Sequence, residues 1–363
     1  MMDAVERVLK AVNHEEPDRV PAFESAFTNN TIVRYYGINP RGGRGYKITY
    51  EFFRKAQIDL VLSYVSALPR MTIKRGKGFI DEYGRIMMLD FQKDGTLILA
   101  YHGGHFESFE DYESWERMDP NLQARMDQFL NGRSVQKELN NEVFSIPATG
   151  SILEDPLEGF GFPTFSKILA KHKQAKKIFD DYGQFTLELV KILSEKDAKI
   201  VLLWDDYGFK NGLFMRPIYY QQYIFPWLKR ICDTAHRNDC KIMLHSDGDI
   251  LEIFDDIVKS GVDIINPIEP TTNNPRYNIF ELHEKYGDRI TFSGNLNPVW
   301  LGIGEISKIE SYARKLIRVL APGGGYLYGS GHSIHSAVTI DRFEAMQNMR
   351  RKYGNYPIVN IPD

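Results

Sequence analysis

The stretch Lys241-Ile242-Met243-Leu244-His245-Ser246-Asp247-Gly248 joins a short apolar run to an imidazole and a carboxylate. The run predicts a buried strand that ends at the histidine. Side chains two residues apart in an extended segment point the same way, so His245 and Asp247 can act on one ligand or one metal ion. The alternative is structural, with His245 satisfied at a strand end and Asp247 as the N-cap of a helix that opens at Asp249.

Similar runs recur along the chain and alternate with helical patterns. The runs predict strands at 19–23, 59–65, 144–149, 199–204, 241–244, 262–265, 290–293 and 326–329. Amphipathic spacing predicts helices at 3–14, 49–57, 164–196, 217–238, 249–260, 278–286, 305–320 and 340–353. The strands lack a clean alternation of polar and apolar residues, which is typical of parallel strands covered on both faces. The sequence therefore predicts an α/β fold, a (β/α)8 barrel.

One segment interrupts the alternation after the second predicted strand. The runs 79–88 and 96–101, with Lys93-Asp94-Gly95 between them, have the pattern of an antiparallel β-ribbon with a turn. We expect an insertion over about 70–136, whose part from Phe106 to Gln136 continues as helix and loop. The chain shows neither an internal repeat nor a low-complexity linker, so we expect one domain over 1–363.

Composition narrows the class of protein. The chain has 363 residues, 43% of them hydrophobic, and a formal net charge of −3 without a dense basic run, which disfavours nucleic acid as a partner. The only two cysteines, Cys232 and Cys240, are too few for a disulfide framework and fit a reducing compartment. The N-terminus lacks the apolar core of a signal peptide, and no window is long enough to span a bilayer. We therefore expect a cytoplasmic protein that acts on a small molecule and not at a membrane.

Polar side chains follow most of the predicted strands. In a barrel the carboxyl ends of the strands form one ring, so these side chains should meet at one mouth. They are Glu24, Tyr64, Asp205, Asp206, Tyr207, His245, Asp247, Glu269, Asn295, His332 and His335. Phe209 lies close behind and is placed to line a pocket.

Two chemistries can use this ring. A zinc-like ion needs three or four nitrogen or oxygen ligands, which His245, Asp247 and His332 can supply, with Glu269 as a further candidate. Alternatively, the acids and histidines can run proton transfers on a carboxylate or carbonyl substrate. The only basic residues near in sequence are Lys210 and Arg216, which favours a metal ion or a cationic intermediate over an anionic substrate.

Several segments together resemble the uroporphyrinogen decarboxylase superfamily over nearly the whole chain. They are Glu16-Pro17-Asp18-Arg19-Val20-Pro21, Trp204-Asp205-Asp206-Tyr207-Gly208, Leu244-His245-Ser246-Asp247-Gly248, Gly261-Val262-Asp263-Ile264-Ile265-Asn266-Pro267, Phe292-Ser293-Gly294-Asn295, and Gly323-Gly324-Gly325-Tyr326 to Gly331-His332. The resemblance implies a single (β/α)8 barrel with its site at the carboxyl ends of the strands, in agreement with the strand pattern.

The chain lacks some residues that are typical of each of the two activities in this superfamily. Decarboxylases of this superfamily carry arginines near the first strand and an aspartate after the second, where this chain has Phe23-Glu24-Ser25 and Leu62-Ser63-Tyr64. Corrinoid-dependent methyltransferases carry a zinc site of one histidine and two cysteines. Here the matching positions are His245, Asp247 and His332, a harder donor set than thiolates.

The resemblance is closer to the methyltransferase branch. It implies transfer of a methyl group between a small methylated compound and a corrinoid protein or thiol acceptor, with zinc or another divalent metal held by His245, Asp247, His332 and Glu269. Asp205, Asp206, Tyr207 and Tyr64 would then shape or protonate the substrate. Glu24, Asn295 and Phe209 would contact it.

Three alternatives stay open at this point. One is a lyase that decarboxylates a tetrapyrrole or another carboxylic acid. Another is a barrel that binds a ligand without catalysis. A homodimer is compatible with any of these readings.

Overall fold

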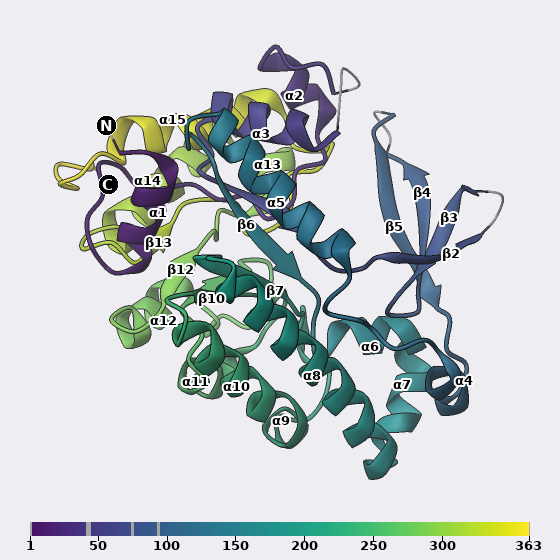
Figure 1. The fold of residues 1–363 in the computed structure, drawn as a ribbon. Coiled ribbons are helices and arrows are strands. Elements are labelled where there is room, and N and C mark those ends of the chain that lie inside the picture. The colour runs from purple at the N-terminus through teal and green to yellow at the C-terminus, as the bar shows by residue number, and fades with distance from the viewer. Residues whose placement is uncertain (1, 41–44, 74–75, 93–94, 363) are drawn as a thin grey trace.

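Seven parallel strands form the central sheet of the protein, whose computed structural model describes residues 2–40, 45–73, 76–92 and 95–362 (Figure 1). In spatial order they are β1 (Leu60–Tyr64), β6 (Phe144–Thr149), β7 (Ile200–Trp204), β10 (Lys241–His245), β11 (Ile264–Asn266), β12 (Thr291–Ser293) and β13 (Tyr326–Leu327). Each corresponds to a run predicted from the sequence, and nearly all their residues are buried, as expected of strands covered on both faces.

The remaining predicted strand, 19–23, closes the ring between β13 and β1. Ala22 bridges Tyr328 and Phe23 bridges Leu60, both in parallel. The Phe23 N–H donates to the Tyr328 carbonyl at 2.9 Å, and the Asp59 N–H donates to the Ala22 carbonyl at 2.9 Å. This segment therefore takes the place of the eighth strand through isolated bridges rather than a full ladder, which confirms the barrel.

Helices surround the strands and connect them. They are α1 (Ala4–Val12), α2 (Asn30–Tyr35), α3 (Gly45–Ala56), α4 (Phe109–Ser114), α5 (Gln123–Glu138), α6 (Glu154–Phe160), α7 (Phe162–Leu169), α8 (His172–Glu195), α9 (Pro217–Tyr219), α10 (Phe225–His236), α11 (Phe254–Lys259), α12 (Ile279–Tyr286), α13 (Pro298–Ile303), α14 (Ile306–Leu320) and α15 (Ile340–Tyr353), with a π-turn η2 (Tyr220–Ile224) and a 3-10 turn η3 (Leu251–Ile253). None of the described helices is both long and apolar enough to cross a membrane.

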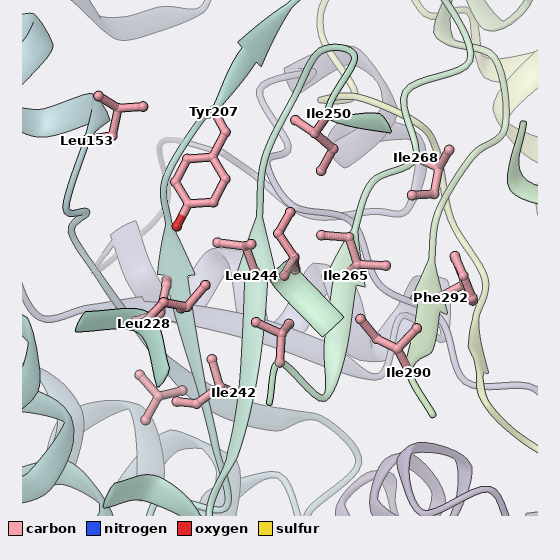
Figure 2. Close-up of a cluster of buried hydrophobic side chains, with 14 of the residues drawn as sticks. Leu153, Tyr207, Leu228, Ile242, Leu244, Ile250, Ile265, Ile268, Ile290 and Phe292 are labelled. Carbon is pink, nitrogen blue, oxygen red and sulfur yellow. The ribbon is translucent and has the colours of Figure 1, made fainter. Parts of the chain in front are cut away.

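Helix α1 packs against residues of the barrel interior. Asp3 caps its N-terminus by accepting from the Glu6 N–H at 2.9 Å. Its buried apolar residues, Val8 among them, form one cluster with inward residues of the strands such as Leu202 and Met243. The other large cluster fills the space between the strands and the outer helices (Figure 2). The barrel is thus a packed core, and α1 contributes to it.

The insertion after β1 is a four-stranded antiparallel sheet, which Figure 1 shows beside the barrel. Its strands are β2 (Pro69–Ile73), β3 (Gly78–Asp81), β4 (Arg85–Phe91) and β5 (Leu97–Gly104). The predicted two-stranded ribbon was incomplete, because the run 79–88 turns back at Gly84, whose φ of +82° suits glycine. The predicted turn at Lys93-Asp94-Gly95 has its first two residues outside the described part of the chain.

Buried ion pairs join this sheet to the rest of the protein. Arg125 on α5 and Glu82 after β3 are both fully buried and form a two-pronged ion pair. Arg125 also donates to the Val65 carbonyl at 3.0 Å, just after β1. Arg85 on β4 lies 2.7 Å from Asp81 and 2.8 Å from Asp155 on α6. The insertion is therefore anchored beside β1 and α6.

Candidate functional site

Three predicted site residues come together where β7 and β10 end. The side chains of Asp206, His245 and Asp247 each offer one ligand atom, and these atoms lie within 4.8 Å of one another. His245 Nε2 is 4.0 Å from Asp206 Oδ1 and 3.9 Å from Asp247 Oδ2. His245 is buried, whereas each of the two carboxylates keeps 23% of its side chain exposed. The cluster therefore opens to the mouth of the barrel.

The orientation of the His245 ring is set by the next strand. Its Nδ1 lies 2.8 Å from Oδ1 of Asn266 at the end of β11, and Asn266 Nδ2 donates to Ser293 Oγ at 3.0 Å on β12. Because an amide oxygen can only accept, Nδ1 carries the hydrogen. In the neutral ring this leaves the Nε2 lone pair directed at the two carboxylates, which is the arrangement that metal-binding histidines use.

Asp247 carries a free acceptor at this point. Its Oδ1 is buried and has no hydrogen-bond partner among the described residues, while its Oδ2 is 3.4 Å from Nε2 of His332. His332 lies beyond β13 and is 46% exposed. Asp247 does not cap the following turn, because it is Asp249 that accepts from the Leu251 N–H at 3.1 Å. A buried carboxylate oxygen without a donor fits a cation, so this donor set is compatible with a divalent metal.

The predicted trio after β7 separates into three environments. Asp205 is buried, and its two carboxylate oxygens accept from the backbone N–H groups of Ile152, Leu153 and Glu154, each at 3.0 Å. Tyr207 is fully buried, and Figure 2 shows it among hydrophobic side chains of the core. Only Asp206 reaches the mouth. Asp205 and Tyr207 therefore do not lie where they could protonate a substrate at the mouth, which corrects that prediction, because alternate residues of the loop point in different directions.

Glu269 supports the cluster from behind. Its Oε2 accepts from the Gly248 N–H at 2.8 Å, and its Oε1 accepts from the hydroxyl of Thr271. Glu269 is absent from the group of ligand atoms that lie within 4.8 Å of one another. Glu269 therefore holds the 245–248 turn and does not belong to the ligand cluster, which corrects its prediction as a metal ligand.

Two predicted substrate contacts are buried in the wall. Glu24 is 2% exposed and accepts from the hydroxyl of Ser330, as well as from its N–H at 3.3 Å. Burial raises the pKa of Glu24 to about 8. Asn295 is 2% exposed, donates to the Ile268 carbonyl and accepts from the Tyr312 hydroxyl at 2.6 Å. Both side chains are buried and engaged by other protein groups instead of being open to the mouth, which corrects the prediction of substrate contact for both.

Aromatic side chains form one rim of the mouth. Tyr64, 52% exposed at the end of β1, lies 6.2 Å from Trp204 between ring centroids. Trp204 in turn stacks on His245 at 4.2 Å. Phe209 is 46% exposed and stacks on Phe214 at 5.9 Å. Tyr64 and Phe209 are therefore accessible to solvent, and the Trp204 ring shields one face of the histidine.

The sequence reading missed three residues of the site. Asn266 and Trp204 end neighbouring strands, and a strand-end search that included amides and indoles would have found them. Glu154 at the start of α6 accepts from the Asp206 N–H at 3.0 Å through Oε2. Burial, followed by the Asp206 charge, raises the pKa of Glu154 well above its usual value. Its position depends on the fold of the loop after β6, which no local motif announces.

The mouth is rich in acids without matching cations. Burial raises the pKa of Asp206 to about 7, the His245 ring opposes this shift and the Asp247 charge adds to it. Of the two basic residues expected nearby, Arg216 stacks on Tyr219 at 5.3 Å instead of pairing with these acids. The clustered carboxylates thus favour a bound cation.

Comparisons with known proteins agree with the barrel fold. A family model described as uroporphyrinogen decarboxylase (URO-D) matches residues 91–353. A protein named uroporphyrinogen decarboxylase from Alkalilimnicola ehrlichii is 24% identical, over 94% of this chain and 92% of its own length. Proteins of the same name from Thioalkalivibrio sulfidiphilus and Magnetococcus marinus are 24% and 22% identical, but the matches span only 42% and 62% of their lengths.

A solved structure shares the whole architecture. A methyltransferase from Methanosarcina mazei superposes with a TM-score of 0.71 and covers 97% of this chain and 99% of its own. Its sequence identity is 16%, so the likeness concerns the fold.

Proposed function

The chain belongs to the uroporphyrinogen decarboxylase family, and on this premise we propose that it is a metal-assisted methyltransferase. It would move a methyl group between a small methylated compound and a corrinoid protein or thiol acceptor. The observation that carries the proposal is the cluster of Asp206, His245 and Asp247, whose ligand atoms lie within 4.8 Å of one another.

The residues of the mouth suit a divalent ion. His245 would contribute Nε2, since Nδ1 is engaged with Asn266. Asp206 and Asp247 would contribute carboxylate oxygens, and His332, 3.4 Å from Asp247, is the nearest further nitrogen. A divalent cation bound here would act as a Lewis acid toward a thiol acceptor or a methyl donor. An all-nitrogen-and-oxygen set suits zinc as well as other divalent ions.

The remaining residues of the mouth position and protonate the ligand. Trp204 and Tyr64 offer an aromatic wall beside His245 for an apolar methyl-bearing group. Burial, and next the charge of the neighbouring Asp206, raise the pKa of Glu154 well above its usual value, which favours the protonated carboxyl. A protonated carboxyl at this place can supply a proton to a leaving alkoxide or amine.

Metal analysis of the purified protein tests the proposal. Protein prepared without chelator should hold about one equivalent of zinc or another divalent ion per chain. His245→Ala should lose it, whereas His236→Ala should keep it, because His236 pairs with Asp263 at 2.8 Å away from the cluster. Absence of stoichiometric metal in the wild type, before and after incubation with zinc, would contradict the proposal.

Decarboxylation is the second candidate, because the three curated relatives carry the name uroporphyrinogen decarboxylase. The buried Glu24 does not repel a substrate carboxylate from the mouth, since it is tied to Ser330. Formation of coproporphyrinogen from uroporphyrinogen that persists after chelation would favour this activity over methyl transfer.

A further inference from the structure

A cavity of about 620 Å³ lies by the amino-terminal ends of the strands, away from the mouth. It is lined by Asp18, Arg19, Gln57, Arg350, Arg351 and Asn355. Arg19 begins the segment that closes the barrel, Gln57 precedes β1, and both Arg350 and Arg351 stand in the last turn of α15. We call this space the arginine cavity. It shares no lining residue with the metal cluster.

Arg350 is the unusual member of the set. Only 2% of it is exposed, and its guanidinium donates through Nη2 to the Gln57 carbonyl at 2.8 Å and through Nη2 and Nε to the Gln347 amide oxygen at 3.2 and 3.4 Å. Among the described residues, no carboxylate lies within ion-pair distance of Arg350, and Nη1 makes no hydrogen bond. A charged donor is therefore left at a cavity wall.

The neighbouring arginines do have partners. Arg19 makes a two-pronged contact with Asp59, at 2.8 Å for both nitrogens. Arg7 binds the same Asp59 at 2.8 Å and Asp18 at 2.6 Å. The carboxylates of Asp18 and Asp59 are therefore already paired with the guanidiniums of Arg7 and Arg19. Asp59 also attracts the Arg350 charge from beyond ion-pair distance, but this carboxylate is already shared by Arg7 and Arg19.

Burial of a guanidinium without a directly paired carboxylate is unfavourable, because its direct hydrogen-bond partners are neutral and the Asp59 charge acts only from farther away. The carboxyl end of α15 offers roughly half a negative charge, which is less than the charge of the guanidinium. Burial lowers the pKa of Arg350 to about 10, and the Arg19 charge lowers it further. The site as it stands therefore favours a mobile anion.

We propose that the arginine cavity binds a small molecule through its phosphate group, with Arg350 as the central ligand. Arginine forks bind phosphate oxygens in pairs. Positive charge reaches the cavity from two elements, the closing segment with Arg19, which is paired with Asp59, and the helix end with Arg350 and with Arg351, which is paired with Glu344 at 2.9 Å. The volume exceeds that of a phosphate ion, so an organic part of the ligand can also enter.

Calorimetric titration tests this site with inorganic phosphate and with glycerol 3-phosphate, at constant ionic strength. We expect saturable binding of one ligand per chain, with the phosphomonoester at least as tight as the free ion. Arg350→Gln should weaken binding tenfold or more, which corresponds to about 1.4 kcal/mol. No saturable binding to the wild type, or binding that survives this change, would overturn the proposal.

Matched variants separate the arginine cavity from other cationic places. Arg351→Gln should weaken binding without touching the buried guanidinium, so it tests the site even if Arg350→Gln fails to fold. Arg133→Gln, which removes an arginine that pairs with Asp197 at 3.4 Å on another surface, should leave binding unchanged.

Two further titrations identify the ligand class and exclude the mouth of the barrel as the binding site. Phosphate binding should persist in His245→Ala, since the proposed metal cluster is elsewhere; its loss there would place the anion at the mouth and refute the inference. Malonate should bind more weakly than phosphate. Tighter malonate binding would overturn the choice of phosphate.

Discussion

Replacement of Asn266 by leucine tests how the barrel would orient His245 for the proposed metal ion. The change keeps a similar volume and removes the oxygen that accepts from Nδ1 at 2.8 Å. Without this acceptor, the hydrogen can move to Nε2, and the ring loses the bond that sets its orientation. Loss of such a supporting partner weakens metal binding by about 10- to 100-fold, or roughly 1.4 to 2.7 kcal/mol.

A competition titration of zinc against a chromophoric chelator measures this effect. Asn266→Asp retains an acceptor for Nδ1 and should bind zinc at least as tightly as the wild type. Asn274→Leu is the matched control, because Asn274 donates to Asp249 at 2.9 Å outside the cluster. If folded Asn266→Leu bound zinc like the wild type, or if Asn266→Asp were equally weak, the argument from ring orientation would be refuted.

Three further predictions concern buried carboxylates. Glu82→Gln should lower the free energy of unfolding, measured in urea, by about 3 to 5 kcal/mol, because buried Arg125 then lacks an opposite charge. The control Glu116→Gln, at a 75% exposed side chain, should change this free energy by less than about 1 kcal/mol. The raised pKa of Glu24, about 8, makes the wild type lose stability as pH rises from about 4.5 to 8. Glu24→Gln should remove this slope and gain about 3 kcal/mol at pH 7, and an unchanged slope in denaturant titrations at several pH values would count against its protonated state. Asp205→Ala should lower the free energy of unfolding by about 1 to 3 kcal/mol, because the backbone N–H groups lose their acceptor, but the variant should still bind zinc. Asp247→Ala should lose zinc with a smaller loss of stability. The reverse pattern in metal analysis would exchange the roles of the two aspartates.

The barrel was predictable because buried parallel strands leave a strong local signal. The run before His245 is apolar and short, and each comparable run occurs as a strand or closing segment of the ring. The spacing of His245 and Asp247 likewise anticipated two side chains on one face, which lie 3.9 Å apart. Periodicity and spacing are local properties, so a single sequence reveals them.

Other features depend on contacts between distant segments. Asp205 and Asp206 are neighbours in sequence, yet one binds the loop before α6 and the other faces the mouth. Nothing local distinguishes them, because the direction of each depends on where the loop after β6 lies. The sequence also did not reveal that Glu24 would be covered by Ser330, a contact across 306 positions.

The closing segment links the order of synthesis to the order in which the barrel can assemble. Residues 19–23 are made long before their partners Tyr328 and Asn355, which lie more than 300 positions further along the chain. Until then, β1 has an open edge on one side, and the Glu24 carboxyl lacks the serine that covers it in the finished ring. The sheet of the nascent chain therefore stays open until the segment around Tyr328 has left the ribosome, and the ring can close only after that point.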